Sequence, residues 1–168
     1  MNRTQSHRIS SNGAAINRQK LVYFKFDQKK YIGYEGDTLA SALLAHGVHL
    51  VGRSFKYHRP RGIFGSGSEE PNALVRLIGD KSSEPNLRAT QIEIYDGLIA
   101  ESQNRFPSLK IDFLSINNVF RRFFPAGFYY KTFMWPTSFW MFYEKLIRKA
   151  AGLGKLSKRY HAVSYTHL

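Results

Sequence analysis

Cationic side chains crowd one short stretch of this sequence and give it the clearest capacity to bind a ligand. Within residues 52–62, which are bounded by glycines, these side chains are Arg53, Lys56, His58, Arg59 and Arg61. The guanidinium group of arginine offers a fixed fork of donors that suits phosphate and carboxylate groups. The stretch could therefore bind an anion, or it could hold neighbouring carboxylates or a partner chain. The sequence leaves both alternatives open.

No other set of residues has the types and spacing of a catalytic or metal site. His46 and His49 are three residues apart, but the helix expected there ends at Gly47 between them, which argues against a metal pair. Glu69 and Glu70 are expected to form a solvated loop pair, and no acid–base dyad stands out. The glycines at positions 62, 65 and 67 match neither a dinucleotide fingerprint nor a P-loop. We predict no catalytic residue and no metal site.

Cysteine is absent from the 168 residues. Its absence excludes a disulfide scaffold, a thiolate nucleophile, a thiolate zinc site and a cysteine-ligated iron–sulfur cluster. The apolar fraction of 43% is high enough for most of the chain to fold. Residues 1–17 lack the apolar core of a secretory signal, and the aromatic stretch at 120–143 is too interrupted to span a membrane. We expect a cytoplasmic protein without a membrane segment.

The formal charge of +13 arises from 25 basic and 12 acidic residues and is concentrated at the two ends. Residues 1–62 carry +8, residues 63–112 carry −3 and residues 113–168 carry +8. A basic module that binds nucleic acid through its phosphates is one explanation. The sequence lacks zinc-finger spacing, a basic heptad region and aromatic RNA-binding strands, so nucleic acid is the weaker alternative to an acidic partner surface or solvent.

The elements that position these residues begin with a hairpin and a helix. Residues 21–26 alternate as a strand does, and residues 31–34 are typical of a returning strand after a polar turn at 27–30. Asp37 is expected to cap a helix that ends at Gly47. The apolar face of this helix comprises Leu39, Ala42 and Leu43.

Further strands are predicted over residues 73–78, 90–95 and 98–101, with turn signals at Gly79-Asp80 and Asp96-Gly97. Two strands, a helix and further strands predict a small α+β domain with the helix packed across a mixed sheet.

The character of the chain changes after Pro107. Helical spacing over residues 112–124 and 138–151 flanks a tract at 125–136 that contains five aromatic residues and two prolines. Residues 120–143 hold twelve aromatic residues, too many for so short a segment to bury on itself. The tract is therefore expected to lie against another surface.

Five blocks of sequence carry a family resemblance. They read GDTLASALLAHGVHLVGRSFKYHRPRGIF (36–64), EEPNALV (69–75), EPNLRATQIEIYDGL (84–98), SQNRFPSL (102–109) and FPAGFYYKTFMWP (124–136). These blocks resemble the N-terminal region of the alpha subunit of heterotetrameric sarcosine oxidase, from about residue 21 to residue 154. The large subunits of N-methylglutamate dehydrogenase and of opine and cyanide-forming amine oxidases share this opening and are the alternatives within the family.

The resemblance implies a domain similar to a [2Fe–2S] ferredoxin, with a β-grasp sheet and one helix, and it places the cluster cysteines within residues 37–62. Because no thiolate is present, we expect a ferredoxin-like scaffold that lacks the iron–sulfur cluster. The resembling complex oxidises the N-methyl group of sarcosine through flavin, yielding glycine and hydrogen peroxide, with folate accepting the one-carbon unit. The resemblance implies FAD, FMN, NAD and tetrahydrofolate as cofactors of the complex. It implies the rest of the alpha subunit and the beta, gamma and delta subunits as partners.

We accordingly expect a disordered tail (1–19), a ferredoxin-like β-grasp domain (20–106) and an aromatic-rich helical or irregular connector (107–154). In the family a dinucleotide-binding domain follows, but residues 155–168 show no glycine fingerprint and look foreign, as a truncated or misread reading frame would. The expected chain is an inactive fragment of an oxidoreductase, a scaffold and subunit-interface part. The cationic side chains of residues 52–62 are expected to contact an anion or acidic partner groups.

Overall fold

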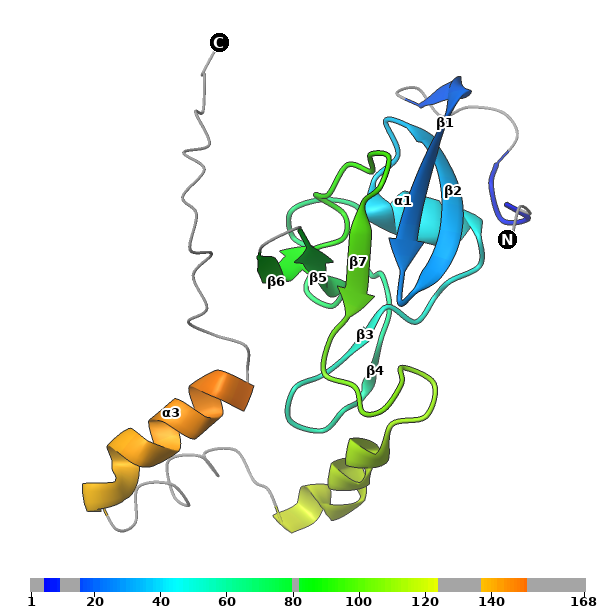
Figure 1. Cartoon of the computed structure of the whole chain (residues 1–168). Coiled ribbons are helices and arrows are strands. Elements are labelled where there is room, and N and C mark those ends of the chain that lie inside the picture. The colour runs from blue at the N-terminus through cyan, green and yellow to red at the C-terminus, as the bar shows by residue number, and fades with distance from the viewer. Residues whose placement is uncertain (1–4, 10–15, 80–81, 124–136, 151–168) are drawn as a thin grey trace.

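The computed structural model describes residues 5–9, 16–79, 82–123 and 137–150, and Figure 1 shows how their elements are arranged. The strands are β1 (Asn17–Phe26), β2 (Lys29–Glu35), β3 (Gly52–Arg53), β4 (Pro60–Arg61), β5 (Leu74–Ile78), β6 (Ser83–Arg88) and β7 (Ile99–Ser102). The helices are α1 (Leu39–Ala45), the 3-10 helices η1 (Phe113–Phe123) and η2 (Thr137–Phe139), and α3 (Trp140–Ala150). One mixed sheet has the order β2-β1-β7-β5-β6, in which β1 and β7 are parallel and the other neighbours are antiparallel.

The hairpin of β1 and β2 confirms the prediction from sequence alternation. The inward side chains of β1 are buried, and they are Val22, Phe24 and Phe26. The turn is tighter than expected, because Asp27 and Gln28 alone connect the strands, with φ values of 46° and 66°. Positive φ at both central residues gives a turn whose twist matches that of the flanking strands.

Helix α1 packs its apolar face into the core that it shares with the sheet, as predicted. Its fully buried residues include Leu39, Ala42 and Leu43, and they belong to the same cluster as Phe24 and Val75 of the sheet. Gly47 ends the helix with a φ of +69°, a conformation that favours glycine. Figure 1 shows α1 lying across the hairpin of β1 and β2.

The prediction that Asp37 caps α1 is wrong. The cap is Thr38, whose hydroxyl accepts a hydrogen bond from Ser41 N at 3.2 Å. The carboxylate of Asp37 is fully buried and accepts from Arg8 Nη2 at 2.6 Å. This ion pair also holds residues 5–9 against the domain, so that part of the expected disordered tail is ordered.

The strands predicted over residues 73–78 and 98–101 are confirmed as β5 and β7, but the strand predicted over 90–95 is wrong. That segment runs beside the start of α1, where Leu39 N donates to the Ile92 carbonyl at 2.7 Å. The Ile92 carbonyl satisfies an amide that the first turn of a helix leaves free, and Ile94 N donates to the Asp37 carbonyl at 3.0 Å, so the segment pairs with the start of α1 and not with the sheet. The strand next to β5 is instead β6, which contains Pro85 and lies at the edge of the sheet, where proline is tolerated.

Helical segments follow the sheet, as predicted. The first, η1, is a 3-10 helix over its whole length rather than an α-helix, and α3 is the second. Apolar side chains of η1 are exposed, with Phe113 65% and Val119 76% accessible. Asp80 and the expected tract at 124–136 and end at 155–168 lie outside the described residues. Among the helices that the structure describes, none has the length and apolar character needed to cross a bilayer.

Candidate functional site

The cationic stretch of residues 52–62 forms a small hairpin, in which β3 pairs antiparallel with β4. Ser54 N donates to the Arg59 carbonyl at 2.9 Å, and His58 N donates to the Ser54 carbonyl at 2.9 Å. His58 itself has a φ of 52°, so the chain reverses sharply before the second strand. This reversal separates the cationic side chains into an inward and an outward set.

Arg53 points into the protein and joins the hairpin to the segment that precedes η1. Its Nε and Nη2 atoms both donate to the Leu109 carbonyl, at 3.0 and 2.9 Å, and Nη1 donates to the His58 carbonyl at 2.8 Å. Its Nε atom also lies 3.4 Å from Asp112 Oδ2, and only 10% of the side chain is accessible. Arg53 is therefore committed to internal contacts.

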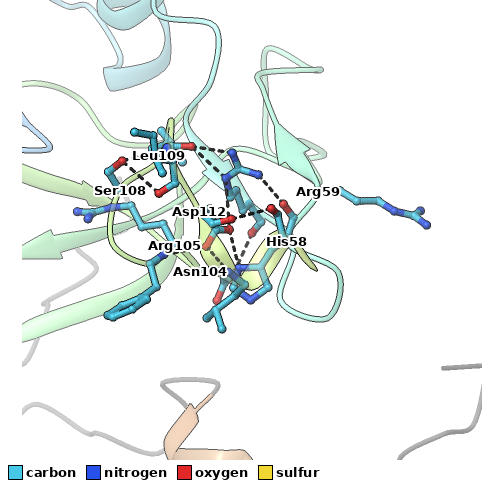
Figure 2. A network of polar contacts seen from close by, with 12 residues as sticks. His58, Arg59, Asn104, Arg105, Ser108, Leu109 and Asp112 are labelled. Atoms are coloured by element: carbon cyan, nitrogen blue, oxygen red, sulfur yellow. Dashed lines mark hydrogen bonds and ion pairs between the residues drawn. The ribbon is translucent and has the colours of Figure 1, made fainter. Parts of the chain in front are cut away.

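Asp112 supplies the anion at the centre of this network (Figure 2). Its fully buried carboxylate lies 2.8 Å from His58 Nδ1 through Oδ2. Its Oδ1 atom accepts from Phe106 N at 3.0 Å and from Leu114 N at 3.2 Å. For Arg53 and His58 the structure thus favours pairing with a neighbouring carboxylate over binding an external anion. Sequence reasoning missed Asp112, although an aspartate just before a helical run is a typical capping signal.

The outward set consists of Lys56 and Arg59, whereas the half-buried Arg61 donates through Nη1 to Asn72 Oδ1. Arg59 is exposed, and Figure 2 shows it extending away from the network around Asp112. Its guanidinium carbon lies 4.8 Å from the centre of the Tyr57 ring, and Lys56 Nζ lies 5.0 Å from the same ring. Arg59 Nε also donates to Asn118 Oδ1 at 3.1 Å, which ties the tip of the hairpin to η1. Lys56 and Arg59 are the part of the predicted site that an outside anion can reach.

The expectation of a solvated Glu69–Glu70 pair is wrong for Glu70. Glu69 is exposed, whereas Glu70 is fully buried and its carboxylate accepts hydrogen bonds from four backbone N–H groups. Burial alone disfavours the charged form, but the hydrogen bonds outweigh it and hold the pKa of Glu70 below its ordinary value of 4.5. Glu70 is therefore a buried, ionised carboxylate that holds the backbone of its own loop. No local sequence pattern signals this role.

Comparison with known families gives the class of this domain. The family described as a 2Fe-2S iron-sulfur cluster binding domain matches residues 19–105. The chain belongs to this family, and its mixed sheet with few helices is an α+β ferredoxin-like fold.

Relatives identify the kind of subunit in which such a domain occurs. The sarcosine oxidase subunit alpha of Rhizobium meliloti (strain 1021) is 56% identical over 153 residues, which are 90% of this chain and 15% of that subunit. The sarcosine oxidase subunit alpha of Corynebacterium sp. (strain U-96) is 42% identical over 91 residues, covering 52% of this chain and 9% of the relative. The chain thus spans a small part of these relatives, and it matches their N-terminal region.

A crystal structure of L-proline dehydrogenase from P. horikoshii aligns with a TM-score of 0.43 and 30% sequence identity. It covers 54% of this chain and 17% of that chain.

The family description implies an iron–sulfur cluster, which such domains hold through cysteine thiolates. This chain contains no cysteine. In the loop of residues 64–73, backbone N–H groups surround the carboxylate of Glu70. Among the described residues, no three histidine, aspartate or glutamate side chains gather where they could hold a metal ion. The residues present do not fit a cysteine-ligated cluster.

Proposed function

We propose that this chain is the N-terminal scaffold of a sarcosine-oxidase-type alpha subunit, without an iron–sulfur cluster and without an active site of its own. The observation that carries the proposal is the 56% identity to such a subunit over 90% of the chain. In the proposed complex, sarcosine is oxidatively demethylated to glycine with formation of hydrogen peroxide. Flavins, NAD and tetrahydrofolate would bind outside this chain, and the complex would be cytoplasmic.

We propose that the scaffold domain comprises residues 20–106 together with the segment up to Asp112. The buried contacts of Arg53 with Leu109 and Asp112 support this extension, because they fasten the segment to the β3–β4 hairpin. The connector would then start at η1, whose exposed apolar side chains suit contact with the next domain or with the beta subunit.

The outward cationic set is proposed to contact acidic groups of the rest of the complex. Lys56 and Arg59 flank one aromatic ring at the tip of a hairpin, so their charges are presented together. Charge complementarity at such a surface steers association and fixes which surfaces meet. No observation on the described residues or in the comparisons favours nucleic-acid binding, and it is not proposed.

Charge reversal in the complete alpha subunit, expressed with its partner subunits, tests this role. The double variant Lys56→Glu and Arg59→Glu should reduce the yield of assembled complex and its bound flavin, because like charges would then face each other. Lys29→Glu with Lys30→Glu is the matched control, since both lysines are exposed at the start of β2. Normal assembly and flavin content in the hairpin variant, with thermal unfolding unchanged, would rule out the proposed contact.

A further inference from the structure

The loop between β4 and β5 folds around one carboxylate. Four N–H groups converge on Glu70, and they belong to Phe64, Gly65, Asn72 and Ala73. Phe64 donates to Oε2 at 2.6 Å, while Asn72 and Ala73 donate to Oε1 at 2.7 and 3.1 Å. The Glu70 residue is 0% accessible, so these amides enclose a buried anion that the chain itself provides.

The residues around this carboxylate have the spacing of a cluster-binding loop. Gly65, Glu70 and Ala73 are separated by four residues and then by two. Plant-type [2Fe–2S] ferredoxins space three of their cysteine ligands as C-x4-C-x2-C. A Cβ atom added to Gly65 would lie 3.6 Å from Glu70 Oε2. Ala73 N donates a hydrogen bond to the other carboxylate oxygen, Oε1. The first and third positions therefore both lie directly beside the carboxylate of the second.

A fourth position comes from outside the loop, as the fourth ligand of such clusters does. Thr90 is 6% accessible, and its hydroxyl donates to the Gly67 carbonyl at 2.8 Å. Its neighbour Ala89 donates through its N–H to the Ala73 carbonyl at 2.9 Å. Thr90 is thus a small buried residue that touches the loop from the far end of β6.

Amides that converge on one point favour an anion there. Iron–sulfur clusters are bound by thiolates and accept hydrogen bonds at sulfur, so a loop built for a cluster would present N–H groups inward. A carboxylate offers two oxygens with about four lone-pair sites, enough to accept all four donors of this loop.

We propose that the carboxylate of Glu70 stands in the place of an iron–sulfur cluster and keeps a former cluster-binding loop folded without metal. This inference rests on the proposal above that the chain holds no cluster. It also moves the expected cysteine positions from residues 37–62 to Gly65, Glu70, Ala73 and Thr90. The four inward N–H groups, and the spacing of positions 65, 70 and 73, are then features of the loop that the loss of cysteine left intact.

Restoring four cysteines in the full chain tests the proposal. The variant Gly65→Cys, Glu70→Cys, Ala73→Cys and Thr90→Cys is incubated anaerobically with ferric iron, sulfide and a thiol reductant, and then desalted. It should retain about two iron and about two sulfide per chain, with visible absorption bands and an electron paramagnetic resonance signal after reduction. The wild-type chain is treated in parallel. Iron and sulfide retained by the wild type would overturn the cluster-free proposal itself, independently of the variant.

Two matched variants separate loop geometry from the mere presence of thiols. In the first, Ser66→Cys replaces Gly65→Cys, so four cysteines remain but the spacing is broken. In the second, Glu70 is kept beside the other three cysteines. Both should retain less than about a tenth of the iron of the four-cysteine variant. The first has four thiolates at the wrong spacing, and the second has only three of the four thiolates that the cluster requires.

Equal iron in the Ser66 variant, or no more iron in the four-cysteine variant than in wild type, would overturn the inference. A four-cysteine variant that is unfolded alone should regain the circular dichroism of its sheet with iron and sulfide, since metal binding then supplies folding free energy. If it stays unfolded under those conditions, the inference fails as well.

Discussion

Replacing Glu70 by an amide of the same size isolates what its charge contributes to the loop of residues 64–73. In Glu70→Gln, one acceptor oxygen becomes an NH2 group that faces backbone donors, so at least one buried N–H loses its partner. We expect the free energy of unfolding at neutral pH to fall by about 3 kcal/mol, measured by urea denaturation. Glu69→Gln, one residue away and exposed, should change it by less than about 0.5 kcal/mol. Equal effects of the two substitutions would contradict the assigned role.

The same residue should make stability depend on pH in the acidic range. Because the pKa of Glu70 is lowered from 4.5 in the folded state, its contribution is fully present above about pH 4.5. That contribution is lost as the pH falls through the folded-state pKa. The wild-type free energy of unfolding should therefore drop more steeply below pH 4.5 than that of Glu70→Gln. Parallel curves for the two proteins would show that the carboxylate is not ionised in the loop.

Asp112 is the second buried acid whose removal should be costly. Asp112→Asn leaves Arg53 enclosed without its carboxylate partner, and breaking a buried pair on one side typically costs about 3 kcal/mol or more. The matched control is Glu144→Gln, which removes the exposed pair with Arg148 on α3 and should cost less than about 0.5 kcal/mol. Chemical denaturation followed by far-ultraviolet circular dichroism measures both free energies of unfolding. A loss for Asp112→Asn as small as that of the control would mean that Arg53 is held by backbone carbonyls alone.

These residues also show how far single positions can be predicted from sequence. Arg53 and Arg59 are the same type in one hairpin, yet one is enclosed and the other exposed, because the reversal at His58 divides them. The partners of Glu70 are backbone N–H groups, which every residue except proline carries and which leave no sequence signal. Charged side chains are also seldom fully buried, so the residue type alone predicts an exposed Glu70.

Among the elements, the hairpin of β1 and β2 contains a turn that can be improved. Gln28 has a φ of 66°, a left-handed conformation that costs a residue with a side chain about 1 kcal/mol and glycine almost nothing. Gln28→Gly should therefore raise the free energy of unfolding by about 1 kcal/mol. Gln28→Ala keeps the unfavourable conformation and should give no gain. Asp27 is left unchanged, because its carboxylate accepts from Ser102 N at 2.8 Å.

Elements were predictable where burial follows the period of the chain, and not where long-range contacts decide. Strict alternation identified β1, and helical spacing identified α1. The segment 90–95 alternates equally well, but its Ile92 carbonyl accepts from Leu39 N of α1, a long-range contact that no local pattern reveals. The prediction that Asp37 caps α1 was wrong for the same reason, since its partner Arg8 lies 29 residues earlier in the chain.

At the scale of the whole molecule, the distribution of charge follows from these contacts. Three enclosed or half-enclosed basic side chains each meet one acid, in the pairs Arg8–Asp37, Arg53–Asp112 and Arg105–Asp27. One-to-one pairing leaves the net charge of +13 unchanged, so the excess within the described residues is carried by more exposed groups such as Arg59. A surface of this kind favours encounter with an acidic partner surface.

The exposed apolar side chains of η1 should matter for assembly and not for the fold. Val119 is 76% accessible, so Val119→Arg should change the stability of the isolated chain by less than about 0.5 kcal/mol. In the complete subunit, the same substitution would bury an unpaired charge wherever η1 meets the next domain or the beta subunit, and assembly should fall severalfold. Tyr95→Arg, at a position 58% accessible in the loop before β7, is the control and should assemble normally. Size-exclusion chromatography of co-expressed subunits measures the outcome, and unimpaired assembly of Val119→Arg would place this face of η1 outside the interface.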